Sequence, residues 1–172
     1  MPDRLVVDAS AAIAIDRAEP TAAAIRTILA DHVAAGGEIV VPGHFWLEFV
    51  NVVMRRYRLT PEDVVGAIRE LDEFGIVTVE IDRPLLMLCL GSIATAGLSA
   101  YDATYLALAE ALGGRLLTLD SRLAAAAGDR AIPGPWLPRH RSAEAQAAYS
   151  PLGLSAFGPY LAELRRRAEA IA

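Results

Sequence analysis

Short apolar runs alternate with longer segments of helical period over the first 120 residues. The runs at residues 4–7, 38–41, 77–81 and 115–119 have the length and composition of buried strands. Turn-forming residues or acids flank these runs, and a segment with helical spacing follows each run. Strands that alternate with helices in this way predict an α/β fold, with helices on both faces of a central parallel sheet.

The predicted helices have recognisable start and stop residues. Gly36 and Gly37 end an alanine-rich helix, while Thr60 supplies an N-cap that Pro61 follows in the first turn of the next one. The helices are predicted to start near residue 10 and to cover residues 21–35, 44–58, 60–75, 84–96 and 100–112.

The last part of the chain differs in character from the rest. A proline-rich segment and a polar stretch lead into residues 157–172, whose end is predicted to form an amphipathic helix. We therefore divide the chain into a domain at 1–132 and a C-terminal extension at 133–172. Trp136 and Tyr160 either pack this helical tail onto the domain or cover a dimer surface.

Composition excludes several classes of protein. The 172 residues are 54% hydrophobic and 22% charged, which favours one packed core over disorder. The single cysteine, Cys89, cannot form an internal disulfide, and the three histidines lack metal-ligand spacing with it, so a structural zinc site is not expected. The sequence contains no lysine, which excludes a phosphate-loop NTPase and Schiff-base catalysis.

Charge and hydropathy also bear on location and partners. The apolar stretches are too short or too interrupted to cross a bilayer, and the N-terminus does not resemble a secretory signal, so we expect no membrane segment and a cytoplasmic protein. A net charge of -5 differs from the basic surface of most nucleic-acid-binding proteins. A nuclease is still compatible with this charge, because an acid cluster loaded with metal cations presents local positive charge.

Three aspartates stand where strands end or helices begin. Asp8 and Asp120 follow predicted strands at the same sheet edge, where functional groups of parallel sheets collect. Asp102 lies in the first turn of a predicted helix, three residues after Ser99. Each aspartate has a helix-capping alternative, and Ser99 with Asp102 matches the capping-box pattern. Capping alone does not predict that several acids gather at one edge.

Glu48 lies within a helical segment rich in large apolar residues. Helical spacing aligns it with His44, Asn51 and Arg55 on one stripe. A solvated polar face explains such a stripe. Because the stripe is narrow and bordered by large apolar residues, we favour a buried or cleft-facing carboxylate that needs a cation partner.

The four acids can converge if the sheet is doubly wound. Clustered carboxylates repel one another unless protons or cations neutralise them, and oxygen-only ligation suits Mg²⁺ or Mn²⁺. Such ions activate water and stabilise the departing oxygen of a phosphodiester. The acids therefore predict phosphodiester hydrolysis.

Four segments carry these acids together with small apolar and hydroxyl residues. They are V-V-D-A-S-A from Val6, E-F-V-N from Glu48, L-S-A-Y-D-A-T-Y-L-A-L-A from Leu98 and L-T-L-D from Leu117. In this order and spacing the chain resembles the PIN-domain ribonucleases, in particular the VapC-like toxins of bacterial toxin–antitoxin pairs. The resemblance covers roughly residues 3–132.

The resemblance implies a PIN-like three-layer α/β/α fold with about five parallel strands. It also implies an endoribonuclease that leaves 5′-phosphate and 3′-hydroxyl ends. Ser10 and Thr118 match hydroxyl positions that support the ligands, and Asn51 is similar to a frequent asparagine of the family with a structural role. The implied catalytic residues and ligands of Mg²⁺ or Mn²⁺ are Asp8, Glu48, Asp102 and Asp120.

Partners are implied by the resemblance alone. VapC-like toxins usually form homodimers and are inhibited by a cognate antitoxin whose peptide occupies the active site. Arg55 and Arg56 end a helix close to Glu48 and are candidates for RNA phosphate contacts, although compensation of the helix dipole explains them as well. The arginines at 165–167 are better explained as a solvated face than as an RNA contact.

Two other functions compete with a nuclease. A non-catalytic PIN domain that binds RNA or docks a protein ranks behind the enzyme, because all four acids are present. A haloacid-dehalogenase-like phosphatase usually needs a second aspartate two residues after the first, and position 10 is serine. The chain also departs from the VapC pattern, because about forty residues follow the point where such domains commonly end.

Overall fold

One parallel sheet forms the centre of the molecule. The computed structural model describes residues 2–136 and Arg166. The strands are β1 (Arg4–Val7), β2 (Glu38–Pro42), β3 (Val77–Val79) and β4 (Arg115–Leu117). They lie in the order β3-β2-β1-β4, and all three neighbouring pairs are parallel. All four residues of β1 are buried, as expected for a strand near the middle of a covered sheet.

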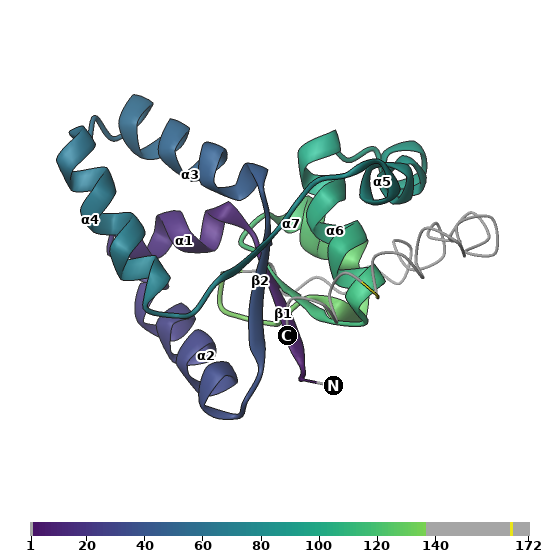
Figure 1. The fold of residues 1–172 in the computed structure, drawn as a ribbon, viewed down its shortest axis with the longest axis horizontal. Coiled ribbons are helices and arrows are strands. Elements are labelled where there is room, and N and C mark those ends of the chain that lie inside the picture. The colour runs from purple at the N-terminus through teal and green to yellow at the C-terminus, as the bar shows by residue number, and fades with distance from the viewer. Residues whose placement is uncertain (1, 137–165, 167–172) are drawn as a thin grey trace.

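Seven α-helices and one short 3-10 helix accompany these strands in the described part of the chain. They are α1 (Ala9–Asp16), α2 (Ala22–Ala34), α3 (His44–Arg55), α4 (Pro61–Asp72), α5 (Arg83–Ala96), α6 (Ala100–Leu112), α7 (Ser121–Ala127) and η1 (Gly128–Arg130). Figure 1 shows α1 to α4 on one side of the sheet, with α5 and α6 on the other. This arrangement confirms the predicted three-layer α/β/α fold.

The strand count differs slightly from the expected five. The described residues contain four strands, and Ala131 adds one isolated parallel bridge to Leu116 beside β4. The Ile132 N–H donates to the Leu116 carbonyl oxygen at 2.8 Å. Within residues 2–136 the chain therefore extends the sheet beyond β4 by a single bridging position rather than by a full strand.

Two boundaries near the acids differ from the predicted ones for local reasons. The third helix ends at Arg55 rather than at residue 58, because Arg58 adopts a left-handed φ of 62° that a helix cannot accommodate. The strand β4 ends at Leu117 rather than at residue 119, because the next backbone N–H groups donate to side-chain hydroxyls. The second departure occurs where side-chain hydroxyl groups replace the regular backbone pattern of the strand.

Turn chemistry sets the start of α6, which carries Asp102. Gly97 adopts the left-handed conformation (φ 61°) that separates α5 from α6, and Arg122 donates to its carbonyl oxygen at 2.7 Å. Within the described residues no single helix is long and apolar enough to span a membrane. The pair α5 and α6 meets that test by length and composition, with a bend of 114°.

Most of the predicted C-terminal extension lies outside the described residues. This applies to Tyr160, to Arg165 and Arg167, and to the helix expected within residues 157–172. Trp136 is partly buried and packs against the core of the domain, whereas Arg166 is exposed.

Candidate active site

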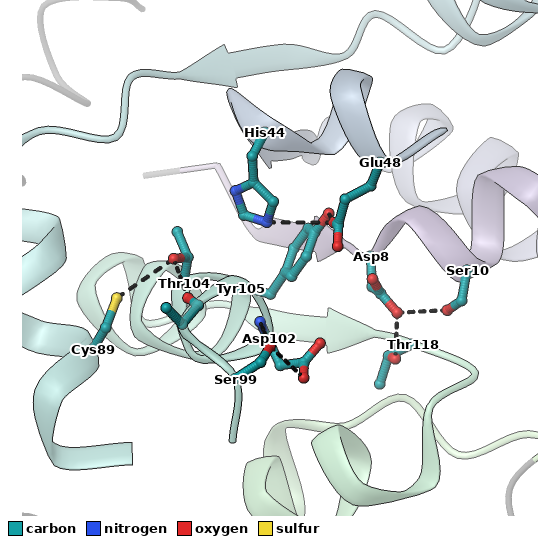
Figure 2. Close-up of polar contacts among 11 residues, drawn as sticks. Asp8, Ser10, His44, Glu48, Cys89, Ser99, Asp102, Thr104, Tyr105 and Thr118 are labelled. Carbon is teal, nitrogen blue, oxygen red and sulfur yellow. Dashed lines mark hydrogen bonds and ion pairs between the residues drawn. The ribbon is translucent and has the colours of Figure 1, made fainter. Parts of the chain in front are cut away.

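Three acids meet at the end of the sheet where the strands finish. Asp8 follows β1 and occupies the N-cap position of α1, Glu48 lies in the second turn of α3, and Asp102 lies in the first turn of α6. Figure 2 shows the three carboxyl groups in one region, each reaching it from a different element. They are close enough for their charges to interact. The charges of Asp8 and Asp102 raise the pKa of Glu48, and the charge of Asp102 raises the pKa of Asp8.

Two hydroxyl groups hold the Asp8 carboxylate. Ser10 Oγ donates to Asp8 Oδ2 at 2.5 Å, and Thr118 Oγ1 donates to the same oxygen at 2.7 Å. The Leu119 N–H donates to Ser10 Oγ and the Asp120 N–H donates to Thr118 Oγ1, both at 3.0 Å. Because each hydroxyl oxygen accepts a backbone N–H, its own proton is directed at the carboxylate. The backbone after β4 thereby orients both donors.

Asp8 stands at an N-cap position without capping the helix. Its side chain makes no capping hydrogen bond to α1 and is buried, with 7% of its surface exposed. Burial raises the pKa of Asp8; the donors Ser10 and Thr118 oppose this shift, and the charge of Asp102 adds to it. A carboxylate in this position favours a bound proton or a cation.

The Thr118 hydroxyl group is expected to stabilise the fold as well as the site. Thr118→Val leaves the Asp120 N–H without its acceptor and Asp8 without one donor, which costs about 1–3 kcal/mol for a buried polar group left unpaired. Urea unfolding measures the loss. Thr27→Val is the control, because the Thr27 hydroxyl donates only to the Ala23 carbonyl oxygen on an exposed helix face. Equal stability of the two variants would contradict this role of Thr118.

Glu48 is held from α6. Tyr105 Oη donates to Glu48 Oε2 at 2.5 Å, and the Glu48 side chain is 33% exposed. Burial raises the pKa of Glu48, the Tyr105 hydrogen bond opposes the shift, and the charges of Asp8 and Asp102 add to it. Tyr105 is a residue of the site that the sequence pattern did not indicate. Its place three residues after Asp102, in the next turn of the same helix, is the feature that could have indicated it.

His44 lies in the same site and was placed on the Glu48 stripe without a role. Its side chain is only 6% exposed, and burial lowers the pKa of the imidazole, so that the neutral form is favoured. His44 Nε2 is 3.4 Å from Glu48 Oε2, yet neither ring nitrogen has a hydrogen-bond partner in the described structure. The contact is therefore a close approach rather than a directed hydrogen bond.

Asp102 combines a capping position with a free oxygen. Ser99 Oγ accepts from the Asp102 N–H at 3.1 Å and donates to Asp102 Oδ2 at 2.7 Å. Ser99 is thus the N-cap of α6, as the sequence pattern indicates. Among the described residues Asp102 Oδ1 makes no hydrogen bond, which leaves it available to a ligand.

The fourth acid is engaged differently. Asp120 is exposed, and its Oδ1 caps α7 by accepting from the N–H groups of Arg122 and Leu123, both at 2.8 Å. Asp120 is connected to Asp8 through Thr118: the Asp120 N–H donates to Thr118 Oγ1, and Thr118 Oγ1 donates to Asp8. In the part of the chain that the structure describes, no three acid, histidine or cysteine side chains form a ready-made metal-binding group.

Two substitutions separate the capping role of Asp120 from a catalytic role. Asn caps helices about as well as Asp, so Asp120→Asn is expected to keep the stability of α7, whereas Asp120→Ala loses about 0.5–2 kcal/mol. Thermal unfolding of both variants measures this difference. If Asp120 also serves the reaction, Asp120→Asn loses activity while remaining stable; full activity of that variant would restrict Asp120 to capping.

The remaining predicted residues lie along α3 and just beyond it. Asn51 and Arg55 are exposed on the face that carries Glu48, and no hydrogen bond joins either of them to the acids in the described structure. The Arg56 guanidinium lies 5.5 Å from the centre of the Tyr57 ring, and that of Arg17 lies 5.0 Å from it. The two neighbouring arginines therefore differ, because only Arg56 stacks against an aromatic ring.

Comparison with known proteins places this geometry in a family. Residues 5–129 match the PIN domain family, a span that includes all four acids. This chain is a PIN-domain protein. The match ends at residue 129, close to the predicted domain boundary at residue 132, and the C-terminal extension lies outside it.

This PIN-domain protein is similar to a curated VapC ribonuclease and to two solved structures. Ribonuclease VapC3 of Pyrobaculum aerophilum is 32% identical over 126 residues, which cover 70% of this chain and 92% of the relative. The crystal structure of PAE2754 from the same organism is 26% identical, with a TM-score of 0.54 and coverage of 76% and 83% of the two chains. Mycobacterium tuberculosis VapC20, described as a sarcin-ricin loop cleaving toxin, shares the fold at 16% identity, with a TM-score of 0.58 and coverage of 75% and 99%. The predicted resemblance to VapC-like PIN domains is confirmed.

Proposed function

We propose that this PIN-domain protein is a metal-dependent endoribonuclease that leaves 5′-phosphate and 3′-hydroxyl ends. The observation that carries the proposal is the convergence of Asp8, Glu48 and Asp102 from three separate elements. A group of partly buried carboxylates is costly unless a cation compensates for its charge. The likeness to Ribonuclease VapC3 supports RNA as the substrate.

The donor set suits a hard divalent cation. The three carboxylates offer oxygen ligands, which Mg²⁺ and Mn²⁺ prefer; burial, and to a smaller extent the neighbouring acids, raises the pKa of Asp8 and of Glu48. Asp8, Glu48 and Asp102 would hold the ion. Asp120 is two residues after Thr118, whose hydroxyl group donates to Asp8. Such an ion, when bound, lowers the pKa of a ligated water and stabilises the departing oxygen of a phosphodiester.

The residues around the acids position them for this chemistry. Ser10 and Thr118 orient the Asp8 carboxylate, and Ser99 fixes Asp102 at the start of α6. These donors are neutral, so they orient the carboxylates without competing with a cation for their charge.

The test is cleavage of a structured RNA by the purified protein in Mg²⁺ or Mn²⁺, with a chelator as control. We expect metal-dependent cleavage and 5′-phosphate ends on the downstream fragments. Binding of RNA without cleavage in any metal would favour a non-catalytic RNA-binding PIN domain instead.

Arg55 is expected to contact an RNA phosphate. It lies two helical turns from Glu48 on the same face of α3, about 10 Å along the axis. Arg55→Ala should weaken RNA binding and reduce the slope of log K against log salt by about one, the loss of one phosphate contact. Arg69→Ala is the matched control, since Arg69 is an exposed arginine in the last turn of α4. Equal salt slopes for both variants would assign Arg55 to the helix dipole.

We also propose that the protein is the toxin of a toxin–antitoxin pair, acting in the cytoplasm as a homodimer. The likeness to VapC proteins supports this partner class. The test is co-expression with any short reading frame immediately upstream. Relief of growth inhibition by that product is expected, and unrelieved inhibition with no complex formed would favour a free-standing nuclease.

A further inference from the structure

Two side chains surround one oxygen of Glu48. Tyr105 Oη donates to Glu48 Oε2 at 2.5 Å, and His44 Nε2 lies 3.4 Å from the same atom (Figure 2). Among the described residues the other oxygen, Oε1, makes no hydrogen bond. The two oxygens of this carboxylate are therefore in different environments, one held by protein and one available.

The Tyr105 ring is held in the core of the molecule. It belongs to α6 and is completely buried. Its ring meets that of His44 edge to face, with centroids 4.8 Å apart and planes at 64°. His44 precedes Glu48 by one turn of α3, so the helix that carries the carboxylate also packs the ring of its hydrogen-bond donor. The ring contact and the hydrogen bond together hold the hydroxyl group at Oε2.

We propose that Tyr105 is a positioning residue for Glu48, holding Oε2 so that Oε1 is presented to a divalent cation shared with Asp8 and Asp102. This inference rests on the proposed function. The terminal torsion of a glutamate is broad, so an unheld carboxylate samples many orientations. A neutral phenol can restrict that torsion without adding a positive charge that would compete with the cation.

A purely structural role makes a different prediction. A buried tyrosine hydroxyl needs an acceptor, but a backbone carbonyl or an amide would satisfy it without the cost of partly burying a charge. If Tyr105 merely fills the core, the loss of its hydroxyl group changes stability and leaves cation affinity unaltered. If it positions Glu48, cation affinity falls in a folded protein.

The test measures Mn²⁺ binding to the full chain without RNA, by titration calorimetry. Tyr105→Phe keeps the ring and removes the hydroxyl group, and we expect its Kd for Mn²⁺ to rise about 10–100-fold, the usual effect of losing a partner of a metal ligand. Thr104→Val is the matched control. Thr104 is the adjacent buried hydroxyl on α6, and it donates to the Ala100 carbonyl oxygen at 2.8 Å rather than to an acid.

Cleavage kinetics and the effect of Tyr105→Phe in a Glu48→Gln variant give two further tests of the positioning role. In Tyr105→Phe the Mn²⁺ concentration for half-maximal cleavage should rise in parallel with Kd, while KM for RNA at saturating Mn²⁺ stays unchanged. In a Glu48→Gln background the Tyr105→Phe change should have no further effect on Mn²⁺ affinity, because Tyr105 acts through Glu48. Thermal unfolding of each variant verifies that it is folded at the temperature of the binding and cleavage measurements.

The outcomes separate this inference from the proposed function. Equal Kd values for wild type and Tyr105→Phe, with normal metal-dependent cleavage, would overturn only the positioning role. A full effect of Tyr105→Phe in the Glu48→Gln background would overturn it as well. Absence of both Mn²⁺ binding and RNA cleavage in the wild type would remove the proposed function and the inference together.

Discussion

Asp8→Asn is expected to lower the rate of RNA cleavage about 10³-fold, because a metal ion contributes several kcal/mol of transition-state stabilisation and each ~1.4 kcal/mol is tenfold in rate. Asp8 is the most buried of the three converging acids and is held by two hydroxyl donors. The asparagine amide oxygen can still accept from Ser10 and Thr118. The fold should therefore survive while the charge that attracts the cation is lost.

The same substitution is expected to stabilise the metal-free protein at neutral pH. Burial raises the folded-state pKa of Asp8 above its usual 3.8, so the folded wild type loses stability as pH rises from 3.8 through that raised pKa. Asparagine does not titrate and avoids this loss. The unfolding midpoint of Asp8→Asn should exceed that of wild type at pH 7, by roughly 2–4 °C for each kcal/mol gained. The difference should vanish below pH 3.8.

A matched control separates the two effects of Asp8→Asn. Asp16 lies at the other end of α1, and burial raises its pKa also. Because Asp16 lies at the opposite end of α1 from Asp8, Asp16→Asn should leave cleavage unchanged. Adding Mn²⁺ should raise the unfolding midpoint of Asp16→Asn but not that of Asp8→Asn, because only Asp8 belongs to the proposed site. Normal cleavage by Asp8→Asn would contradict the assignment.

Asp102→Asn is expected to reduce cleavage about 10²-fold with little change in stability. The N-cap of α6 depends on Ser99 Oγ accepting the Asp102 N–H at 3.1 Å, and that bond does not involve the carboxylate. The substitution thus removes the charge and keeps the cap. Steady-state cleavage and thermal unfolding measure the two properties separately.

Asp82→Asn provides the comparison at a helix start outside the site. Asp82 caps α5 by accepting from the Leu85 N–H at 3.0 Å, and asparagine can replace it there. We expect Asp82→Asn to keep both activity and stability. A comparable loss of activity in the two variants would mean that Asp102→Asn acts through the helix rather than through the carboxylate.

The local elements were largely predictable because their causes are local. Thr60 is the predicted N-cap and forms a capping box with Asp63, and all four apolar runs form the expected parallel strands. The end of α3 was not predictable, since the left-handed conformation of Arg58 belongs to a loop with no glycine at that position. The expected fifth strand reduces to one bridge at Ala131, because a short segment at a sheet edge is decided by packing rather than by its own sequence.

The candidate site was predictable in its residue types and only partly in its contacts. Asp8 and Thr118 are 110 positions apart, so their hydrogen bond is not encoded in any periodicity. Tyr105 and Glu48 meet through the packing of α6 against the end of the sheet, which places a core residue in contact with a carboxylate. Capping and metal binding were alternatives for Asp120, and the structure engages its Oδ1 in a cap.

The central claim is that carboxylates from three elements share one cation. A crystal structure of the protein with Mn²⁺, read from the anomalous scattering of manganese, tests it most directly. We predict a peak in the anomalous difference map for one manganese ion coordinated by the carboxylate oxygens of Asp8, Glu48 and Asp102. A protein saturated with Mn²⁺ that shows no peak among these three carboxylates, or a peak bound only elsewhere, would contradict the claim.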